Sequence, residues 1–406
     1  MAPEIARSAP SSTAFVGRAP HGPADEPVHV GSWDRFEEVF GAADGSEALD
    51  APEAALAAAV RGFFANGGSE AMVVRVPRRG QTGQGPAAGA HGEAAATADF
   101  VGGERRATGT GLYALDTGPA GVDDVDLLVI PPYLPAPPGE SFGDVDYQGL
   151  LPEALAWCAA RRALMVLDPP AGWGSVAEVD PAHPALAHAS PDAALYFPRV
   201  RRADGVRGVP PSGAVAGVIA RTDAARGPWK SPAGLDARLA GCEPEVAVGA
   251  DASTMLNGYG ICPLRTFTGS GPVVWGARTT AAGSAEWRYI AVRRTALAVL
   301  QDVGRGTAWA ASEPNGRRLW EALRATVEEY VQALWRDGAF PGWTPDVSYF
   351  VRCGEDTASR EEHAAGTAVV LIGLAVQRAG EFSLLRVPVA TADAAATTPP
   401  AARVGA

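Results

Sequence analysis

Short apolar runs alternate with helical patterns through the first 240 residues of the chain. Each run is bounded by Gly or Pro, as is typical of buried strands, and between the runs apolar residues recur at helical spacing. The expected strands are 15–16, 71–76, 125–130, 163–168 and 194–197. The expected helices are 33–40, 53–64, 151–161 and 214–222. This alternation predicts an α/β domain over residues 13–240, with a sheet joined by crossover helices.

After residue 240 the pattern changes to long helices followed by strands. A helix is expected over 286–303 and a longer one over about 316–336, with Asn315 as its N-cap and apolar residues at i+3 and i+4. Three strands follow, at 348–353, 367–376 and 382–389. We therefore expect an α+β domain over 241–390, with two long helices and a small sheet.

Three stretches lack such periodicity. Residues 1–12 are expected to be a short arm, and residues 78–110 a mobile loop rich in Gly and Ala. Residues 391–406, rich in Ala, Thr and Pro, are expected to be a disordered tail.

The last expected strand has apolar residues on both faces, and such a strand needs cover on both sides. Two interpretations remain open: donation into a neighbour's sheet, where backbone hydrogen bonds give affinity, or an ordinary final strand of its own domain. The residues concerned are Phe382, Leu384, Leu385, Val387 and Val389.

Composition argues against several functional classes. The formal charge is −12 and Lys230 is the only lysine, so the chain is a poor binder of nucleic-acid phosphates and has no Walker A lysine. Its apolar runs are too short to cross a bilayer and its first residues are no secretory signal, which predicts no direct membrane insertion and synthesis in the cytoplasm. The bias to Arg, Ala, Gly and Pro indicates a bacterial source.

The sequence contains only weak candidates for catalytic or metal-binding residues. Ser141 lies in a G-x-S-x-G stretch, but that motif works where a strand turns sharply into a helix, and the Pro-rich surroundings predict a solvent loop. His183 and His188 have no carboxylate placed to complete a site. The four cysteines lie far apart without metal-ligand spacing, and are expected to be buried thiols. We therefore expect no catalytic, cofactor or metal site, and a cytoplasmic α/β hydrolase is the alternative function.

Arginines and large aromatic residues alternate closely between residues 273 and 320. These side chains are over-represented in packed protein–protein contacts, so the segment predicts assembly rather than catalysis. The residues assigned to subunit packing are Trp275, Arg278, Trp287, Arg288, Arg293 and Arg294. For Arg221, Asp223 and Arg226, ion pairs within the chain and a role between subunits both remain open.

This segment also resembles the C-terminal domain of contractile tail sheath proteins, which occur in phage tails, R-type bacteriocins and extracellular contractile injection systems. The resemblance rests on the order Val-Trp-Gly-Ala-Arg-Thr, Trp-Arg-Tyr-Ile-Ala-Val-Arg-Arg, Glu-Pro-Asn and Leu-Trp between residues 274 and 320. Residues 209–232 are similar to the family's central signature and residues 12–20 to its N-terminal opening. These blocks span residues 12–320 in the correct order.

The resemblance implies a subtilisin-like topology for the α/β domain and a structural role without enzymatic activity. Such a subunit forms a helical homopolymer, built of hexameric rings, around an inner tube. It contracts from a metastable extended state, without nucleotide hydrolysis, and drives the tube through a target envelope. The implied partners are other copies, the inner tube, and baseplate and cap proteins. A baseplate or cap role for this chain itself is a further alternative.

Two details of the resemblance concern the chain's own segments. A tube contact is implied at Arg360, Glu361 and Glu362, with a solvated turn as the alternative. Family members carry an extended arm before the N-terminal opening, whereas 14 residues precede Phe15 here. We therefore expect either a different pairing of the arm or a specialised variant at one end of the tail.

Overall fold

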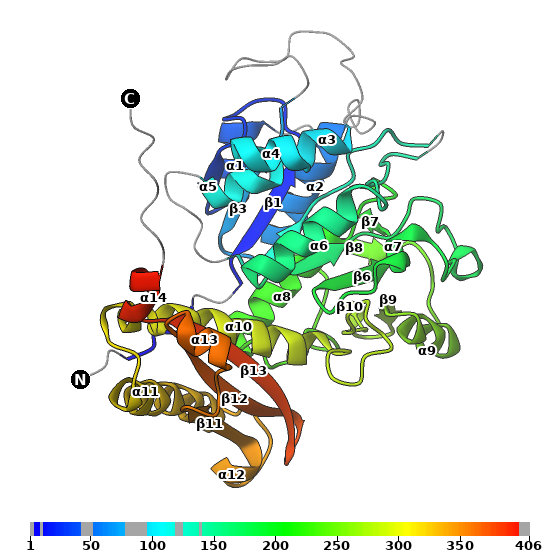
Figure 1. The fold of residues 1–406 in the computed structure, drawn as a ribbon. Coiled ribbons are helices and arrows are strands. Elements are labelled where there is room, and N and C mark those ends of the chain that lie inside the picture. Colours follow the sequence, from blue (N-terminus) through cyan, green and yellow to red (C-terminus); the bar gives the residue numbers. More distant parts are fainter. Residues whose placement is uncertain are drawn as a thin grey trace, which may run out of the picture. The chain divides into compact units, whose positions relative to one another are not determined.

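A computed structural model describes residues 4–8, 11–41, 52–77, 96–117, 125–137 and 140–397. The chain divides into two compact units (Figure 1). The large unit is Ala9–Arg293, and the small unit combines Met1–Ser8 with Arg294–Ala406. The division differs from the expected boundary after residue 240, because residues 261–274 add two strands to the sheet of the large unit.

The large unit is built on an eight-stranded sheet with the order β10-β9-β6-β5-β4-β1-β3-β2. The central strands are parallel, and the edge strands β2 and β10 run antiparallel to their neighbours. The bounds are β1 Thr13–Gly17, β2 Pro27–Val30, β3 Ala71–Arg75, β4 Leu127–Val129, β5 Leu164–Leu167, β6 Ala193–Phe197, β9 Ile261–Phe267 and β10 Gly271–Val274. A separate antiparallel ribbon pairs β7 (Val200–Arg202) with β8 (Cys242–Pro244). The expected α/β sheet with crossover helices is confirmed.

Hydrophobic cores cover both faces of this sheet, because side chains alternate along each strand. In β1, Phe15 points into one core and Ala14 and Val16 into the other. The first core contains α1 (Trp33–Phe40), α2 (Pro52–Ala65) and α8 (Ser212–Arg226). The second contains α3 (Thr97–Phe100), η1 (Gly111–Tyr113), α5 (Ala114–Thr117), α6 (Leu150–Arg161), α7 (Pro184–Ala187) and α9 (Ala250–Gly258).

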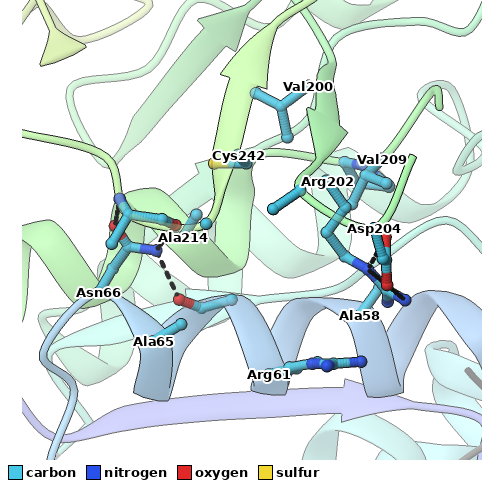
Figure 2. Close-up of a pocket in the computed structure, with 15 residues that line it drawn as sticks. Ala58, Arg61, Ala65, Asn66, Val200, Arg202, Asp204, Val209, Ala214 and Cys242 are labelled. Carbon is cyan, nitrogen blue, oxygen red and sulfur yellow. Dashed lines mark hydrogen bonds and ion pairs between the residues drawn. The ribbon is translucent and has the colours of Figure 1, made fainter. Parts of the chain in front are cut away.

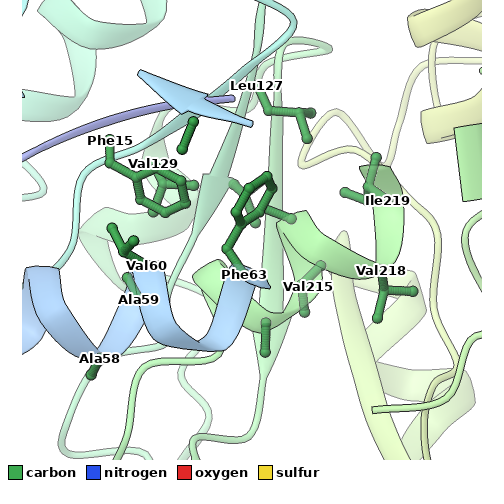
Figure 3. Packing of buried hydrophobic residues seen from close by; sticks show 14 of the residues in the cluster. Phe15, Ala58, Ala59, Val60, Phe63, Leu127, Val129, Val215, Val218 and Ile219 are labelled. Carbon is green, nitrogen blue, oxygen red and sulfur yellow. The ribbon is translucent and has the colours of Figure 1, made fainter. Parts of the chain in front are cut away.

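Helices α2 and α8 pack closely on one face of the sheet. Phe63 of α2 meets Phe15 edge to face at 5.4 Å between ring centroids, beside Val215 and Ile219 of α8 (Figure 3). A Cβ at Gly213 of α8 would collide with the backbone of α2. Glycine at this position therefore allows the close approach of the two helices.

Two segments expected to be irregular contain helices. Part of the expected loop 78–110 forms α3 and α4 (Gly103–Thr108), while residues 78–95 lie outside the described part. Part of the expected tail 391–406 forms α14 (Ala392–Thr397), and residues 398–406 lie outside the described part. Both expectations are wrong for the described residues, because low-complexity composition alone does not exclude short helices.

The small unit contains a three-stranded antiparallel sheet, β11-β12-β13. The strands are β11 Tyr349–Cys353, β12 Thr367–Arg378 and β13 Glu381–Ala390. Its helices are the greater part of α10 (Ile290–Gly306), η3 (Ala308–Ser312), α11 (Arg317–Arg336), α12 (Pro345–Ser348), α13 (Arg360–Ala364) and α14. This arrangement has the two long helices and small sheet that the sequence predicts.

Residues 4–8, expected to be part of an arm, are docked on the small unit. Ile5 is buried against Gly306 of α10. The backbone N–H of Ser8 donates to Asp302 at 2.9 Å, and Arg7 pairs with Asp337 at 2.6 Å.

Two expected helix starts are wrong. The helix expected from residue 286 begins at Ile290, because the backbone before it bonds elsewhere: the N–H of Thr279 donates to the carbonyl of Arg288 at 2.9 Å. Asn315 does not cap α11, whose N-cap is Gly316. Its side-chain oxygen instead accepts from the indole N–H of Trp320 at 2.7 Å.

Candidate functional site

The segment predicted for assembly is largely engaged within its own chain. Arg293 makes a two-pronged ion pair with buried Asp192, at 2.7 and 3.2 Å, and its guanidinium lies 5.1 Å from the ring centre of Trp287. Arg278 donates to the carbonyl of Asn257 at 3.0 Å. Arg288 donates to the carbonyl of Ser284 at 3.1 Å. These groups fix the segment before α10 and the first turn of that helix.

The two remaining members of this set differ in exposure. Trp275 is half-buried against Phe267, at 4.7 Å between ring centroids, and Arg265 lies over both rings. Arg294 is buried in the small unit. Contact with a neighbouring subunit stays a prediction for all six residues.

Arg221, Asp223 and Arg226 of α8 have separate roles. Arg221 donates to the backbone carbonyls of Asn66 and Arg238, at 3.0 and 2.8 Å, and so ties α8 to two other segments. Buried Asp223 accepts from the hydroxyl of Ser11. The first two residues therefore support the fold of the large unit, whereas Arg226 is exposed at the end of α8.

The charged segment predicted to contact the tube forms α13. Ser359 and Glu362 make a capping box, with Glu362 accepting from the N–H of Ser359 at 2.7 Å. That hydrogen bond, together with the Arg386 guanidinium 3.0 Å away, lowers the pKa of the Glu362 carboxyl. Arg360 and Glu361 are exposed. Glu362 thus serves the local fold, and Arg360 and Glu361 carry the exposed charge of this segment.

The strand expected to be apolar on both faces has one buried and one exposed face. Leu385, Val387 and Val389 of β13 are buried, whereas Leu384 is 56% exposed and Phe382 is half-buried beside Phe350. Strand β13 pairs with β12 of the same chain from Ala390 to Ser383. In the single chain, the face that carries Phe382 and Leu384 is therefore apolar but not fully covered. In the structure of a single chain β13 completes its own sheet, and its exchange with a neighbour stays a prediction.

Ser141 borders a polar cavity of about 390 Å³ in the large unit. Trp173, Arg207 and Glu245 also line this cavity, and the Arg207–Glu245 ion pair measures 3.1 Å. The described lining residues include no histidine that could act as a base for Ser141. Gly139, the first glycine of the G-x-S-x-G stretch, lies outside the described residues.

A buried carboxyl–hydroxyl pair, which was not among the residues predicted from the sequence, has a raised carboxyl pKa. Asp168, just after β5, accepts from both the N–H and the hydroxyl of Ser212 at 2.7 Å. Burial raises the pKa of Asp168 to about 6, although the bonds from Ser212 oppose the rise. Both side chains are buried. The pair anchors the start of α8 to the sheet, and a buried strand ending in Asp was the signal in the sequence.

Arg199 holds the loops at the same edge of the sheet. Its buried guanidinium donates to the carbonyls of Pro169 at 3.1 Å, Phe142 at 2.9 Å and Gly143 at 2.7 Å, and to the Asp144 carboxylate at 2.9 Å. Because all of these acceptors belong to the same chain, Arg199 has a structural role. Nearby, the rings of Tyr147 and His183 pack edge to face.

A second cavity, of about 320 Å³, lies between α2, the start of α8 and the β7–β8 ribbon (Figure 2). Its walls are mostly small and apolar residues, with Arg61 and the Arg202–Asp204 pair among the polar ones. Within the described residues, no cluster of His, Cys, Asp and Glu is arranged to hold a metal ion. No helix of the described part is long and apolar enough to cross a membrane.

Solved structures with the same fold are known. The chain matches one from the sheath complex of an extracellular contractile injection system, PVC, in the contracted state, with 26% identity and a TM-score of 0.67 over 94% of this chain and 92% of that one. The helical sheath of the anti-feeding prophage in the contracted state matches with 26% identity and a TM-score of 0.67, over 95% and 94% of the two chains. The chain is a structural relative of the contractile sheath proteins.

A chain from the baseplate of the anti-feeding prophage is equally similar, with 26% identity and a TM-score of 0.67 over 95% of both chains. No protein-family model and no curated protein sequence matches the chain. The sheath likeness covers both units, the large parallel sheet and the small antiparallel one. The resemblance read from residues 12–320 is thereby confirmed, and with it the mixed α/β architecture.

Proposed function

We propose that this chain is a structural subunit of a contractile sheath. Many copies polymerise helically around an inner tube, and the polymer shortens from a metastable extended state to drive the tube through a target envelope. The observation that carries the proposal is the match over more than nine-tenths of both chains to proteins from a sheath complex and a helical sheath.

The arrangement of the described residues supports a structural role. The perturbed carboxyl Asp168 is buried against Ser212, and the cavity beside Ser141 has no histidine among its described lining residues. A subtilisin-like topology, which the sequence resemblance implies for the sheet, adds no activity by itself, because function depends on a site and not on a fold. Contraction then draws on two alternative packings of the same subunits.

The proposed partners are other copies of the chain in hexameric rings, the inner tube, and baseplate and cap proteins. Expression with its tube protein should give tubes visible by negative staining, with the tube protein inside. A chain that remains a small oligomer under all conditions contradicts the sheath function. The hydrolase alternative predicts ester or peptide hydrolysis that Ser141→Ala abolishes, and we expect neither.

A baseplate position is a second candidate, and one observation favours it: a chain from a baseplate structure matches as well as the sheath chains do. The two positions differ in copy number. A sheath subunit outnumbers the baseplate proteins in a purified particle, whereas a baseplate subunit is present in one ring. Quantitative mass spectrometry of the particle separates them.

A further inference from the structure

Trp343 has the most exposed large hydrophobic side chain in the described part of the chain, at 99% exposure. The turn that carries it is nevertheless held firmly. Ser348 donates to the carbonyls of Pro341 at 3.0 Å and Thr344 at 2.8 Å, and Trp335 donates to the carbonyl of Gly342 at 3.3 Å. The chain is thus fixed on both sides of Trp343. A large aromatic side chain on a fixed turn loses little freedom on binding, which suits it to anchor an interface.

The cavity between α2 and the β7–β8 ribbon has the size and lining for such an anchor. Small residues create the space, among them Ala58, Gly62, Ala65 and Ala214. Its volume of about 320 Å³ lies at the lower end of the roughly 300–1,000 Å³ typical of ligand sites, so it suits one large side chain.

The walls of this cavity are fixed by hydrogen bonds. The side chain of Asn66, at the end of α2, donates to the carbonyl of Ala240 at 3.2 Å and accepts from its N–H at 2.8 Å (Figure 2). The wall formed by Asn66 and Ala240 is therefore fixed.

Guanidinium groups line the cavity together with the small residues. Exposed Arg61 already lies 5.7 Å from the ring centre of Trp33, and Arg202 pairs with Asp204 at 2.9 Å. A guanidinium attracts the face of an aromatic ring, most strongly that of Trp. An apolar cavity with arginine in its lining therefore matches an indole better than an aliphatic group.

We propose that Trp343 of one copy of this chain inserts into the cavity between α2 and the β7–β8 ribbon of another copy. The contact joins two different surfaces of the same chain, so it is heterologous and passes from copy to copy instead of closing a dimer. A second copy is the occupant because every chain carries both surfaces and the matching chains come from a helical sheath and a sheath complex. The inference rests on the proposed function and identifies one contact of the polymer.

The first test compares the assembly of three full-length variants by sedimentation. Trp343→Ala removes the inserted side chain, and Ala65→Phe fills the cavity from an exposed helical position. Leu235→Ala is the control, because Leu235 is 50% exposed and does not line the cavity. A central tryptophan contributes at least about 2 kcal/mol, so both test variants should need roughly thirtyfold more protein to assemble. The control should assemble as the wild type does. Unchanged assembly of Trp343→Ala overturns the inference and leaves the sheath function standing.

The second test does not require polymers. Thr344→Cys and Ala203→Cys chains, both carrying Cys353→Ser, are mixed and oxidised, so that Trp343 itself is kept; Thr344 is exposed next to Trp343, and Ala203 is exposed and lines the cavity. We expect a covalent heterodimer, and much less product when Leu235→Cys replaces Ala203→Cys. Equal yields from the two mixtures, or no heterodimer, overturn the inference. A wild-type chain that never forms tubes contradicts the proposed function, and the cross-link then still decides whether the contact exists.

Discussion

Ile5 packs on Gly306, the last residue of α10, so closely that a Cβ at position 306 would lie 2.6 Å from Cγ1 of Ile5. The contact is part of a larger anchor. Asp302, one turn earlier in α10, accepts from the N–H of Ser8 at 2.9 Å and from the hydroxyl of Tyr330 at 2.6 Å. A segment at the start of the chain thus completes the core of the small unit.

Replacement of Gly306 by alanine should displace this segment. The added methyl overlaps Ile5, and overpacking of this kind costs about 1–3 kcal/mol. The gain in helix propensity, up to about 1 kcal/mol, offsets only part of that cost. Urea unfolding measures the difference. Gly258→Ala is the matched control, because Gly258 ends α9 and has nothing within 4 Å of an added Cβ. Equal effects at the two glycines would show that Ile5 is not held at this site.

The Asp168 carboxyl should make stability depend on pH. Its pKa is about 6 in the folded chain, against 3.8 for an unperturbed carboxyl. Between these values the folded chain keeps a proton that the unfolded chain has released, so stability falls as the pH rises from about 4 to 6. The total loss is about 3 kcal/mol and is complete at about pH 7.

Asp168→Asn removes this titration and keeps the size of the side chain. We expect the difference in unfolding free energy, wild type minus variant, to decrease by about 2.4 kcal/mol between pH 4 and pH 7. Denaturant titrations at several pH values measure it. A difference that stays constant would mean that Asp168 is ionised throughout.

The two faces of β13 should respond differently to charge. Leu385→Asp with Val387→Asp places two carboxylates in the core of the small unit, and we expect that unit to unfold, with a loss above about 4 kcal/mol. Leu384→Asp on the exposed face should change stability by less than about 0.5 kcal/mol. Circular dichroism and thermal melting distinguish the outcomes. A stably folded double variant that no longer polymerises would instead support exchange of β13 between subunits.

Contact between α13 and the inner tube should depend on exposed charge. Glu361→Arg reverses one exposed charge and leaves the capping box of Glu362 intact. Each exposed pair contributes only about 0–1 kcal/mol, so the effect depends on repetition along the tail and weakens with salt. Co-sedimentation of sheath and tube at several salt concentrations tests this, with Glu381→Arg at the exposed start of β13 as a control. Identical salt curves for the two variants would argue against a specific tube contact.

The sequence predicted the elements that periodicity determines and missed those that depend on distant partners. The buried strands at 163–168 and 194–197 and the apolar stripe of α11 carry their own pattern. Residues 261–274 do not: they join the large sheet because β9 pairs with β6, which no local pattern records. Gly316, rather than Asn315, caps α11, because the Asn315 side chain is engaged by Trp320.

The prediction of interface residues also depends on partners that are distant in the sequence. Alternating arginine and tryptophan residues predicted contact surfaces between subunits. Arg293, however, forms an ion pair with Asp192 of the same chain, 101 positions away. Trp343 carried no signal in its local sequence, because exposure depends on the turn that Ser348 holds. The hydrogen bond from Ser8 to Asp302 could not be predicted either, because the two residues are 294 positions apart in the sequence.

The docking of residues 4–8 has a consequence for the order of events during synthesis. These residues leave the ribosome before the large unit does, but their binding surface on α10 and α11 emerges roughly 300 residues later. Domains usually fold from the N-terminus onward as the chain is made, at about 5–20 residues per second. The large unit can therefore fold before the binding surface for residues 4–8 has been synthesised. For at least about 15 seconds of translation, Ile5 stays exposed to chaperones and to other nascent chains.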